Sequence, residues 1–474
     1  MPAEAPYHEV ADPGSLAPFG TEVEAGNPSG WPGYSRLLQR ARLASGARHA
    51  VTTGLARVGG HPCVLVGFEY GFLGGSLGVA EGTKIARAFT VAAAQRLPVV
   101  CVAASGGARM QEGTSALVQM QVIAAAIAAA RSAGIPYIAV AGDPTTGGVW
   151  SSLVAGADVV LAVTGARVSF SGTRTRPAGA DPGSPEFGAA GQWRQGFLDA
   201  LVPAGGLRDQ VAVILELLSP RSRGDDNNPI PWLAPKEAGP VGKAGTADGA
   251  GAAAGGAGTA DGPELDAWAL VSGARDARRA RADRWLAAYF GTTFEIRGDR
   301  CGGVDTGLRC GFGARDGTTI GYIAQTGQPT KPAGFRTATR LVTLAARFRR
   351  PVLTLVDTPG ASAMPGDEAA GVGPAIAELL VSLAAAQIPV TTVVIGEGVS
   401  GGAVALASPA GLWMAPGGYL AVTTPEHAAS ILKLPANEVP QVATRLRLTP
   451  ADLISRGIAR GLVHPPPGLD RAEG

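Results

Sequence analysis

Uninterrupted apolar runs, without polar alternation, mark four segments of this chain. Such runs are typical of strands that helices cover on both faces of a sheet. Residues 115–133 are rich in Ala, Gln and Met and contain no Gly or Pro, so they predict a long helix between two of the runs, and residues 374–386 predict its counterpart. The four predicted strands are residues 99–103, 137–141, 352–356 and 390–395. The pattern therefore predicts an α/β fold.

The two regions that hold these elements share a spacing. In the first region 38 residues separate Pro98 from Pro136, and in the second 38 separate Pro351 from Pro389. A glycine pair follows the second proline of each region by 11 and 12 residues, respectively. Agreement of several features in the same order indicates a duplicated unit of strand, helix, strand, glycine pair and helix.

The composition divides the 474 residues into two globular regions. Residues 1–30 are acidic and rich in Pro and Gly and are expected to form a flexible tail. Residues 31–220 and 263–474 are expected to form the two domains. Between them, residues 221–262 contain a long Gly/Ala tract that cannot bury enough apolar surface to order itself, so they are expected to be a linker.

Charge and cysteine content exclude several classes of protein. The net charge is +2 with no basic block, which argues against nucleic acid as a partner. The four cysteines form no Cys-x-x-Cys pair, so no zinc or other metal site is expected. No signal peptide is visible, and the apolar run 122–130 is too short to span a bilayer, so we expect a cytoplasmic protein without a membrane partner.

Glycine pairs provide the candidate chemistry. Gly147-Gly148 and Gly401-Gly402 each follow a predicted strand and precede a helical stretch. Such a turn exposes backbone N–H groups at a helix N-terminus and lets an anionic oxygen approach closely. The loop that contains Gly106 and Gly107 is a third candidate of the same kind. The alternative for each is an ordinary tight turn that binds no ligand. The presence of two equivalent glycine pairs in a duplicated fold makes this alternative less favoured.

No side chain stands out as a nucleophile or general base. The sequence lacks a phosphate-binding G-x-x-x-x-G-K-[ST] loop and a G-x-S-x-G nucleophile elbow, and its five histidines are scattered. Any catalysis is therefore expected to depend on backbone electrostatics and on a cofactor that brings its own base.

Longer motifs resemble a known family. Residues 68–78, 104–113 and 143–148 resemble the β subunit of bacterial acetyl-CoA carboxylase carboxyltransferase. Residues 354–360, 394–403 and 424–432 resemble the α subunit of the same enzyme, and residues 267–336 resemble the opening segment of that subunit. The resemblance implies two crotonase-like domains (ββα superhelices) in tandem, in the order β then α.

The resemblance also implies a reaction and partners. Carboxybiotin on a separate carrier protein would give its carboxyl group to acetyl-CoA or another short acyl-CoA, yielding malonyl-CoA or a homologue. Gly147 and Gly148 would serve the acyl-CoA, while Gly402 and Ala403 would serve biotin. A biotin carboxylase and a biotin carboxyl carrier protein would be partners, and a homodimer would build each site between opposite halves.

Other residues are weaker candidates for ligand contact. Gly106, Gly107 and Gly401 lie in the loops that would hold the ligands. The basic residues that would contact the CoA phosphates are Lys84, Arg109, Lys331 and Arg336, each of which has the alternative of being a solvated surface charge.

Departures from the family pattern keep other functions open. The chain lacks the four-cysteine zinc ribbon of the β subunit, so no zinc is expected, and residues 173–177 and 362–370 diverge. The alternatives are a biotin-independent malonyl-thioester decarboxylase and a non-catalytic CoA-binding paralogue. Neither the acyl chain length nor the pathway follows from the sequence.

Overall fold

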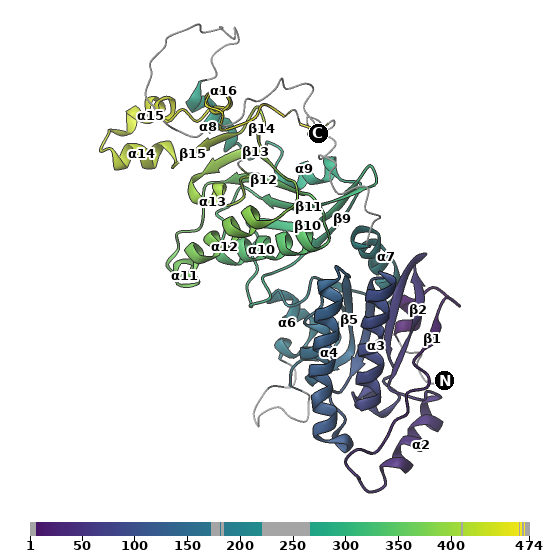
Figure 1. The fold of residues 1–474 in the computed structure, drawn as a ribbon. Helices are drawn as coiled ribbons and strands as arrows, with labels where there is room; N and C mark the ends of the chain where they lie inside the picture. The colour runs from purple at the N-terminus through teal and green to yellow at the C-terminus, as the bar shows by residue number, and fades with distance from the viewer. Residues whose placement is uncertain are drawn as a thin grey trace, which may run out of the picture.

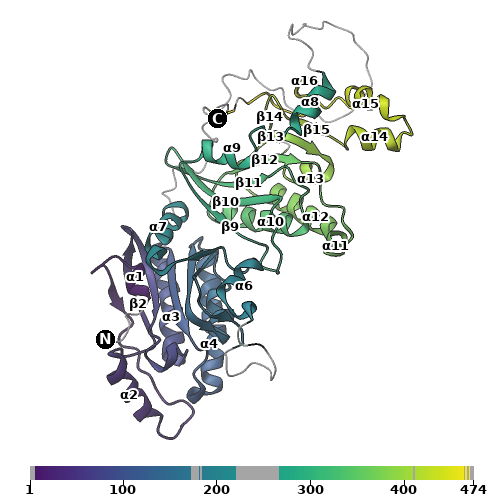
Figure 2. The same ribbon diagram turned by 180° about the vertical axis from the view of Figure 1, so that it is seen from behind.

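The described residues form two α/β domains, each built on one sheet (Figure 1). The computed structural model describes residues 6–171, 181, 184–219, 266–408, 411–463, 465–466 and 469. The expected linker 221–262 and the divergent segment 173–177 lie outside these residues. The two domains are stacked end to end, with α7 (Leu207–Leu218) at their junction (Figure 2).

The first domain contains a mixed sheet of strand order β1-β2-β3-β4-β5-β6-β8, with β7 beside β5. An antiparallel β2–β3 hairpin is followed by parallel β3, β4, β5 and β6. The strands are β1 Ala17–Phe19, β2 Val51–Val58, β3 His61–Phe68, β4 Val99–Ser105, β5 Tyr137–Thr146, β6 Val159–Val163, β7 Val168–Ser169 and β8 Ala200–Val202. Besides α7, the helices are α1 Tyr7–Val10, α2 Tyr34–Ser45, α3 Val79–Gln95, α4 Thr114–Ser132, α5 Gly147–Val149 and α6 Ala189–Arg194.

The second domain repeats this plan with strand order β14-β13-β12-β11-β10-β9, and β15 lies beside β13. The β10–β11 hairpin is antiparallel and β11, β12 and β13 are parallel. The strands are β9 Thr292–Ile296, β10 Leu308–Arg315, β11 Thr318–Gln325, β12 Val352–Thr358, β13 Val390–Val399, β14 Leu412–Met414 and β15 Tyr419–Ala421. The helices are α8 Ala267–Ala274, α9 Ala282–Tyr289, α10 Pro332–Arg347, α11 Pro365–Ala369, α12 Val372–Ala385, α13 Ser400–Val404, α14 Pro425–Ile431, α15 Val439–Arg445 and α16 Pro450–Ser455.

The predicted α/β fold is confirmed, and all four predicted strands are present, but each extends past its apolar run. In both domains the register of the two central strands shifts near their carboxyl ends, between Ala103 and Ser105 and between Val356 and Thr358. The extra polar residues join the strands beyond these bulges, where apolar periodicity gives no signal. The two predicted long helices correspond to α4 and α12.

Residues 6–30 differ from the expected flexible tail. Tyr7 and Val10 are buried in α1, and β1 pairs with β2 in antiparallel register. Asp12 accepts hydrogen bonds from the N–H groups of Gly59 and Gly60, each at 2.8 Å. A few apolar side chains and one carboxylate thus anchor a segment whose overall composition resembles a linker.

Helix α4 is long and apolar enough to cross a membrane by length and composition alone. In this fold it packs along α3 on one face of the sheet, as Figure 1 shows. Ile123 and Ile127 lie in the core beneath it, whereas Leu117, Val118 and Val122 are exposed. The helix therefore has one core face and one apolar face open at the surface of the single chain.

Buried carboxylates of the first domain hold the second domain in place. The Asp199 side chain has no exposure and accepts hydrogen bonds from Arg300 at 2.6 Å and from Arg340 at 3.1 Å. Asp158 forms an ion pair with Arg347 in the same way. Burial raises the pKa of Asp199, but Arg300 and Arg340 outweigh it, so the pKa lies below its ordinary value.

We expect Asp199→Asn to destabilise the protein by about 3 kcal/mol, because it leaves two largely buried guanidinium groups, 19% and 15% exposed, without their counter-charge. The depressed pKa makes this contribution present above the unfolded carboxyl pKa, about 3.9, and lost as the pH falls below it. Urea unfolding of both proteins at several pH values measures the difference. The exposed Asp209→Asn should change stability little, and equal loss in both variants would contradict the assignment.

Candidate active site

The first glycine site lies at the carboxyl ends of β4 and β5. The loop after β4 and the turn that opens α5 almost touch, because a Cβ atom added at Gly107 would lie 3.7 Å from the Cα of Gly147 and 3.8 Å from the nitrogen of Gly148. Gly107 and Gly147 both have positive φ, +110° and +62°. Glycine allows this backbone conformation and this approach. The structure therefore brings together Gly106, Gly107, Gly147 and Gly148.

Hydrogen bonding within the site leaves particular amides free. The N–H groups of Gly106, Gly107 and Gly147 donate to Gly74 O, Ser105 Oγ and Phe170 O at 2.9, 3.0 and 3.0 Å. Those of Ala108 and Gly148 donate to no acceptor among the residues that the structure describes. Sequence reasoning selected Gly147, whose amide already has an acceptor, and did not single out Ala108, although Ala108 lies within the 104–113 motif.

The second domain repeats this geometry at a constant offset. A parallel bridge joins Leu77 to Ala108, and its copy joins Thr330 to Ala361, each 253 residues later. Thr358 Oγ1 accepts from the Gly360 N–H at 3.1 Å, as Ser105 Oγ accepts from Gly107. Across the described part of this domain, the Ala361 N–H has no internal acceptor. The predicted duplication therefore extends to individual hydrogen bonds.

The offset corrects the expected pairing of the glycine pairs. It aligns Gly147 with Ser400, and both have left-handed backbone conformations, with φ of +62° and +59°. Gly148 consequently corresponds to Gly401 and not to Gly402. The difference between the 11- and 12-residue spacings is a change of residue type at one position, because a serine here adopts a conformation that usually favours glycine.

Gly402 and Ala403 lie inside α13, where close packing requires small residues. A Cβ atom at Gly402 would lie 2.3 Å from the nitrogen of Ala361, so only glycine fits. Gln325 Nε2 donates to the Gly402 carbonyl at 2.9 Å, and this hydrogen bond joins β11 to the first turn of α13. Gly401 is exposed, whereas Ala403 is buried. These residues hold α13 against the loop after β12.

Arg109 does not have the predicted role. Its side chain is fully buried, with ion pairs to Glu81 at 2.8 Å and Glu112 at 3.1 Å and a hydrogen bond to the Tyr34 hydroxyl at 3.2 Å. Such a group is not accessible to a phosphate of CoA. It ties the start of α3 to the loop after β4, a role that the glycine-rich sequence around it did not reveal.

The other predicted cations lie in different environments. Lys84 on α3 is buried and lines a cavity in the first domain. Lys331 is exposed at the N-terminus of α10, and its backbone N–H donates to Asp305. Arg336 is half-buried and pairs with Asp299 at 2.7 Å. The structure thus does not gather these three at one surface.

Asp357 is a positioning residue that sequence reasoning missed. It is fully buried at the end of β12, pairs with Arg279 and Arg281, and accepts from the Glu397 N–H at 3.2 Å. Asp357 is the one charged residue of β12, whose other residues are apolar or threonine, and this was the available signal. Within the described ranges no three His, Cys, Asp or Glu side chains are grouped as metal ligands.

The two glycine sites of one chain lie far from the domain junction. The junction involves Asp158, next to the start of β5, whereas Gly147 follows the end of that ten-residue strand, about 30 Å away. Arg347 and Arg350 likewise precede β12, whose opposite end carries the second site. Both sets of strands thus point the ends that carry the glycine sites away from the junction.

Comparison with known proteins gives the family. The family model described as acetyl co-enzyme A carboxylase carboxyltransferase-like matches residues 262–473, and the carboxyl transferase domain model matches 27–178. The acetyl-coenzyme A carboxylase carboxyl transferase subunits beta/alpha of Salinispora arenicola are 37% identical, covering 98% of this chain and 82% of that protein. A probable biotin-dependent acyl-coenzyme A carboxylase beta3 subunit of Mycobacterium tuberculosis is 30% identical, covering 96% and 88%.

Solved structures share the fold. Transcarboxylase 12S, with hydrolysed methylmalonyl-coenzyme A bound, superposes with a TM-score of 0.76 at 19% identity over 97% of this chain and 86% of that one. A single-chain, multi-domain long-chain acyl-CoA carboxylase gives 0.73 at 20% identity, over 98% and 46%. Fold and site define a crotonase-like enzyme of two tandem domains. The chain belongs to the acetyl-CoA carboxylase carboxyltransferase family, with β-type and α-type halves fused, and is a biotin-dependent carboxyltransferase.

We expect Gly402→Ala to lower the unfolding free energy by about 2 kcal/mol and carboxyl transfer by about tenfold or more, because the added methyl group forces α13 off the Ala361 loop. Thermal unfolding and a transfer assay measure both. Gly373→Ala is the matched control, since its methyl group meets nothing within 4 Å on the exposed side of α12. Unchanged behaviour of Gly402→Ala would show that the packing at Ala361 is not tight.

Proposed function

We propose that this chain transfers a carboxyl group from carboxybiotin, carried by a separate protein, to acetyl-CoA or another short acyl-CoA. The product is malonyl-CoA or a homologue. The observation that carries the proposal is the pair of equivalent turns, each with free backbone amides at the carboxyl end of parallel strands. The family relationship supports the same reaction, and the relatives named above are acetyl- and acyl-CoA carboxylase subunits.

The turns fit this chemistry because each holds backbone N–H donors that have no acceptor among the described residues. In the first domain, the amides of Ala108 and Gly148 hold the thioester oxygen as the enolate forms, and each well-placed donor contributes about 3–4 kcal/mol. In the second, the amides of Ala361 and Gly401, beside Gly402 and Ala403, hold the ureido oxygen of biotin. Carboxybiotin supplies the carboxyl group and the ureido nitrogen that takes the α-proton. No side-chain base is needed in this scheme.

A complete site needs two copies of the chain in this proposal. The glycine turns of one chain both lie at strand ends remote from the domain junction, so the two oxygens must be brought together across a subunit contact. Exposed apolar side chains on α4 and α12 suit such a contact. They are Leu117 at 53%, Val118 at 45% and Val122 at 41% exposed on α4, and Leu380 at 40% and Val381 at 68% on α12. We propose a homodimer.

The same proposal includes the partners and the compartment. A biotin carboxyl carrier protein brings the carboxybiotin, and a biotin carboxylase recharges it. We place the reaction in the cytoplasm. CoA phosphates would find Lys331 exposed at the N-terminus of α10, and Arg336 half-exposed on the same helix.

Purified chain incubated with labelled carboxybiotin and a panel of short acyl-CoAs should yield labelled malonyl-CoA or a homologue. Avidin, which sequesters biotin, should abolish the transfer. Absence of label from every short acyl-CoA would refute the proposal. Loss of CO2 from malonyl-CoA at equal rates with and without avidin would instead support a biotin-independent decarboxylase.

Complementation between inactive variants tests the shared site. Gly147→Val and Gly402→Val should each abolish transfer, because a β-branched residue does not fit the left-handed turn and a larger side chain does not fit beside Ala361. Mixed dimers keep one intact site built from the unmutated half of each chain. Random exchange should then restore about a quarter of wild-type activity. No recovery in confirmed mixed dimers would place the site within one chain.

A further inference from the structure

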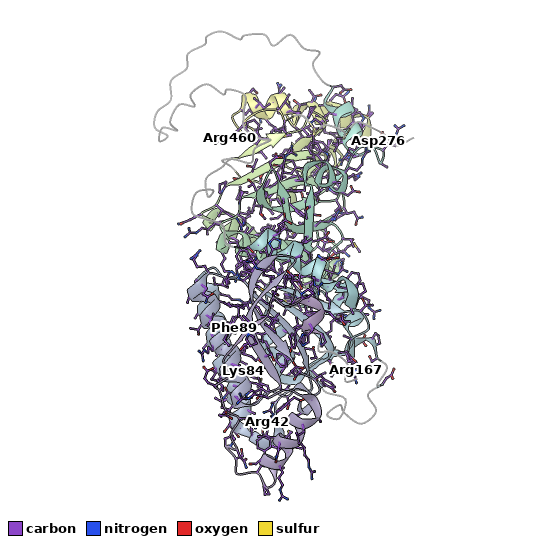
Figure 3. The ribbon with its side chains drawn as sticks, turned by 90° about the vertical axis from the view of Figure 1, so that its right-hand side faces the viewer. Arg42, Lys84, Phe89, Arg167, Asp276 and Arg460 are labelled. Carbon is purple, nitrogen blue, oxygen red and sulfur yellow. The ribbon has the colours of Figure 1, made fainter. Side chains whose placement is uncertain are left out.

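The first domain contains a cavity of about 760 Å³ at the edge of its sheet. It is bordered by β1, by the start of β2 and the loop before it, and by the carboxyl ends of β3, β4 and β5. Among the residues that line it are Phe19, Thr53, Tyr70, Ala104 and Asp143. Figure 3 shows Lys84, another lining residue, on α3 between Phe89 and the α2 residue Arg42.

Two buried side chains of this cavity have no partner. His49 is 3% exposed, and neither of its ring nitrogens has a hydrogen bond. Lys84 is 5% exposed, and its ammonium group forms no hydrogen bond or ion pair with any residue that the structure describes. Unpaired polar groups are costly to bury and are normally satisfied. The His49 ring therefore points to a ligand that supplies the missing interactions, and the unpaired charge of Lys84 lines the same cavity.

The carboxylates around the cavity do not fill this role. Glu69 accepts from the Tyr7 hydroxyl, and Asp143 pairs with Arg167 at 2.8 Å. On α3, Glu81 pairs with Arg109 at 2.8 Å. At the rim, Glu24 and Glu22 pair with Arg48 and Arg87, and His8, which also lines the cavity, stacks on Tyr7. None of these carboxylates forms a hydrogen bond or ion pair with His49 or Lys84, so both side chains remain without a partner among the described residues.

The second domain offers an internal comparison. The position 253 residues after Lys84 is Thr337, whose hydroxyl donates to the Ala333 carbonyl at 2.7 Å. The α-type half therefore has no charged group at the equivalent point of α10. The unpaired lysine is a property of the acyl-CoA half alone and not of the repeated fold.

We infer that His49 and Lys84 form a binding site for a phosphate group, with Arg48 at the rim and room in the cavity for the attached molecule. A phosphate offers several acceptor oxygens and a charge that a buried ammonium can neutralise, and a lysine binds it as a point charge. Ala104, which lines the cavity, precedes Gly107 by three residues, so one wall of the cavity lies within about 10 Å of the first glycine turn.

Two sources of the phosphate are possible in chemical terms. One is the phosphorylated nucleotide end of the acyl-CoA, and this choice rests on the function proposed above. The other is a free phosphorylated metabolite that binds beside the substrate. The shared chemistry, a phosphate monoester recognised by His49 and Lys84, is the same in both cases.

Isothermal titration of the full chain with inorganic phosphate and with adenosine 3′,5′-bisphosphate tests the site. Wild-type protein should bind the bisphosphate, and Lys84→Met should weaken binding about tenfold or more, because it removes the buried charge. Arg40→Gln, an equal charge change on exposed α2 outside the cavity, should bind as wild type does. Equal binding by Lys84→Met and Arg40→Gln, or no binding by wild type, would overturn the inference.

His49→Leu separates ligand binding from a structural role. Because the ring nitrogens have no partner to lose, this variant should keep or raise the unfolding temperature while its affinity for the bisphosphate falls. A fall in stability with unchanged affinity would show that the ring is structural and would overturn its part in the site.

Competition distinguishes the two sources. Displacement of the bisphosphate by acyl-CoA, with a raised KM and unchanged kcat for Lys84→Met, would identify the phosphate as that of the substrate. Simultaneous binding of acyl-CoA and the bisphosphate would identify a separate phosphorylated ligand. Either result supports the site, and because binding requires no turnover, both remain measurable if the chain fails to transfer carboxyl groups.

Discussion

One backbone bridge in each domain determines where the free amides point. Leu77 donates to the Gly107 carbonyl and accepts from Arg109, which leaves the intervening Ala108 N–H directed away from the bridge. Thr330 does the same for Ala361. Because the bridge clamps the loop after one central strand to the start of a long helix, the amide is held before any substrate binds. Electrostatic stabilisation of this kind is effective only when such preorganisation exists.

The close approach that completes each site is made by a different residue in each domain. In the first, Gly107 and Gly147 let two loops come together, and in the second Gly402 lets α13 approach Ala361. Ser400 takes the left-handed conformation that Gly147 has in the first domain. The two halves thus keep one hydrogen-bonding scheme while their residue types have diverged. This supports the proposal that one half serves an acyl thioester and the other serves biotin.

The orientation of the two fused halves is set by buried ion pairs at their junction. Asp158 and Asp199 carry buried charges from the first domain into contact with arginines of the second, so the orientation of the domains depends on matched ion pairs. Removing one partner of such a pair costs more stability than the intact pair contributes, because the remaining charge stays buried without a partner. The resulting arrangement turns both glycine sites outward, and this is why the proposed active site requires a second copy of the chain.

Local pattern in the sequence determined the strands, the long helices, the repeat and the turns that carry Gly106, Gly147 and Gly401, because each depends on neighbouring residues. It did not reveal that Arg109 is buried against Glu81, that Ser400 replaces a glycine, or that residues 6–30 pack on the sheet. The unpaired state of His49 and Lys84 was equally invisible. Whether a polar side chain finds a partner depends on contacts between residues far apart in the chain, and only the tertiary structure decides these.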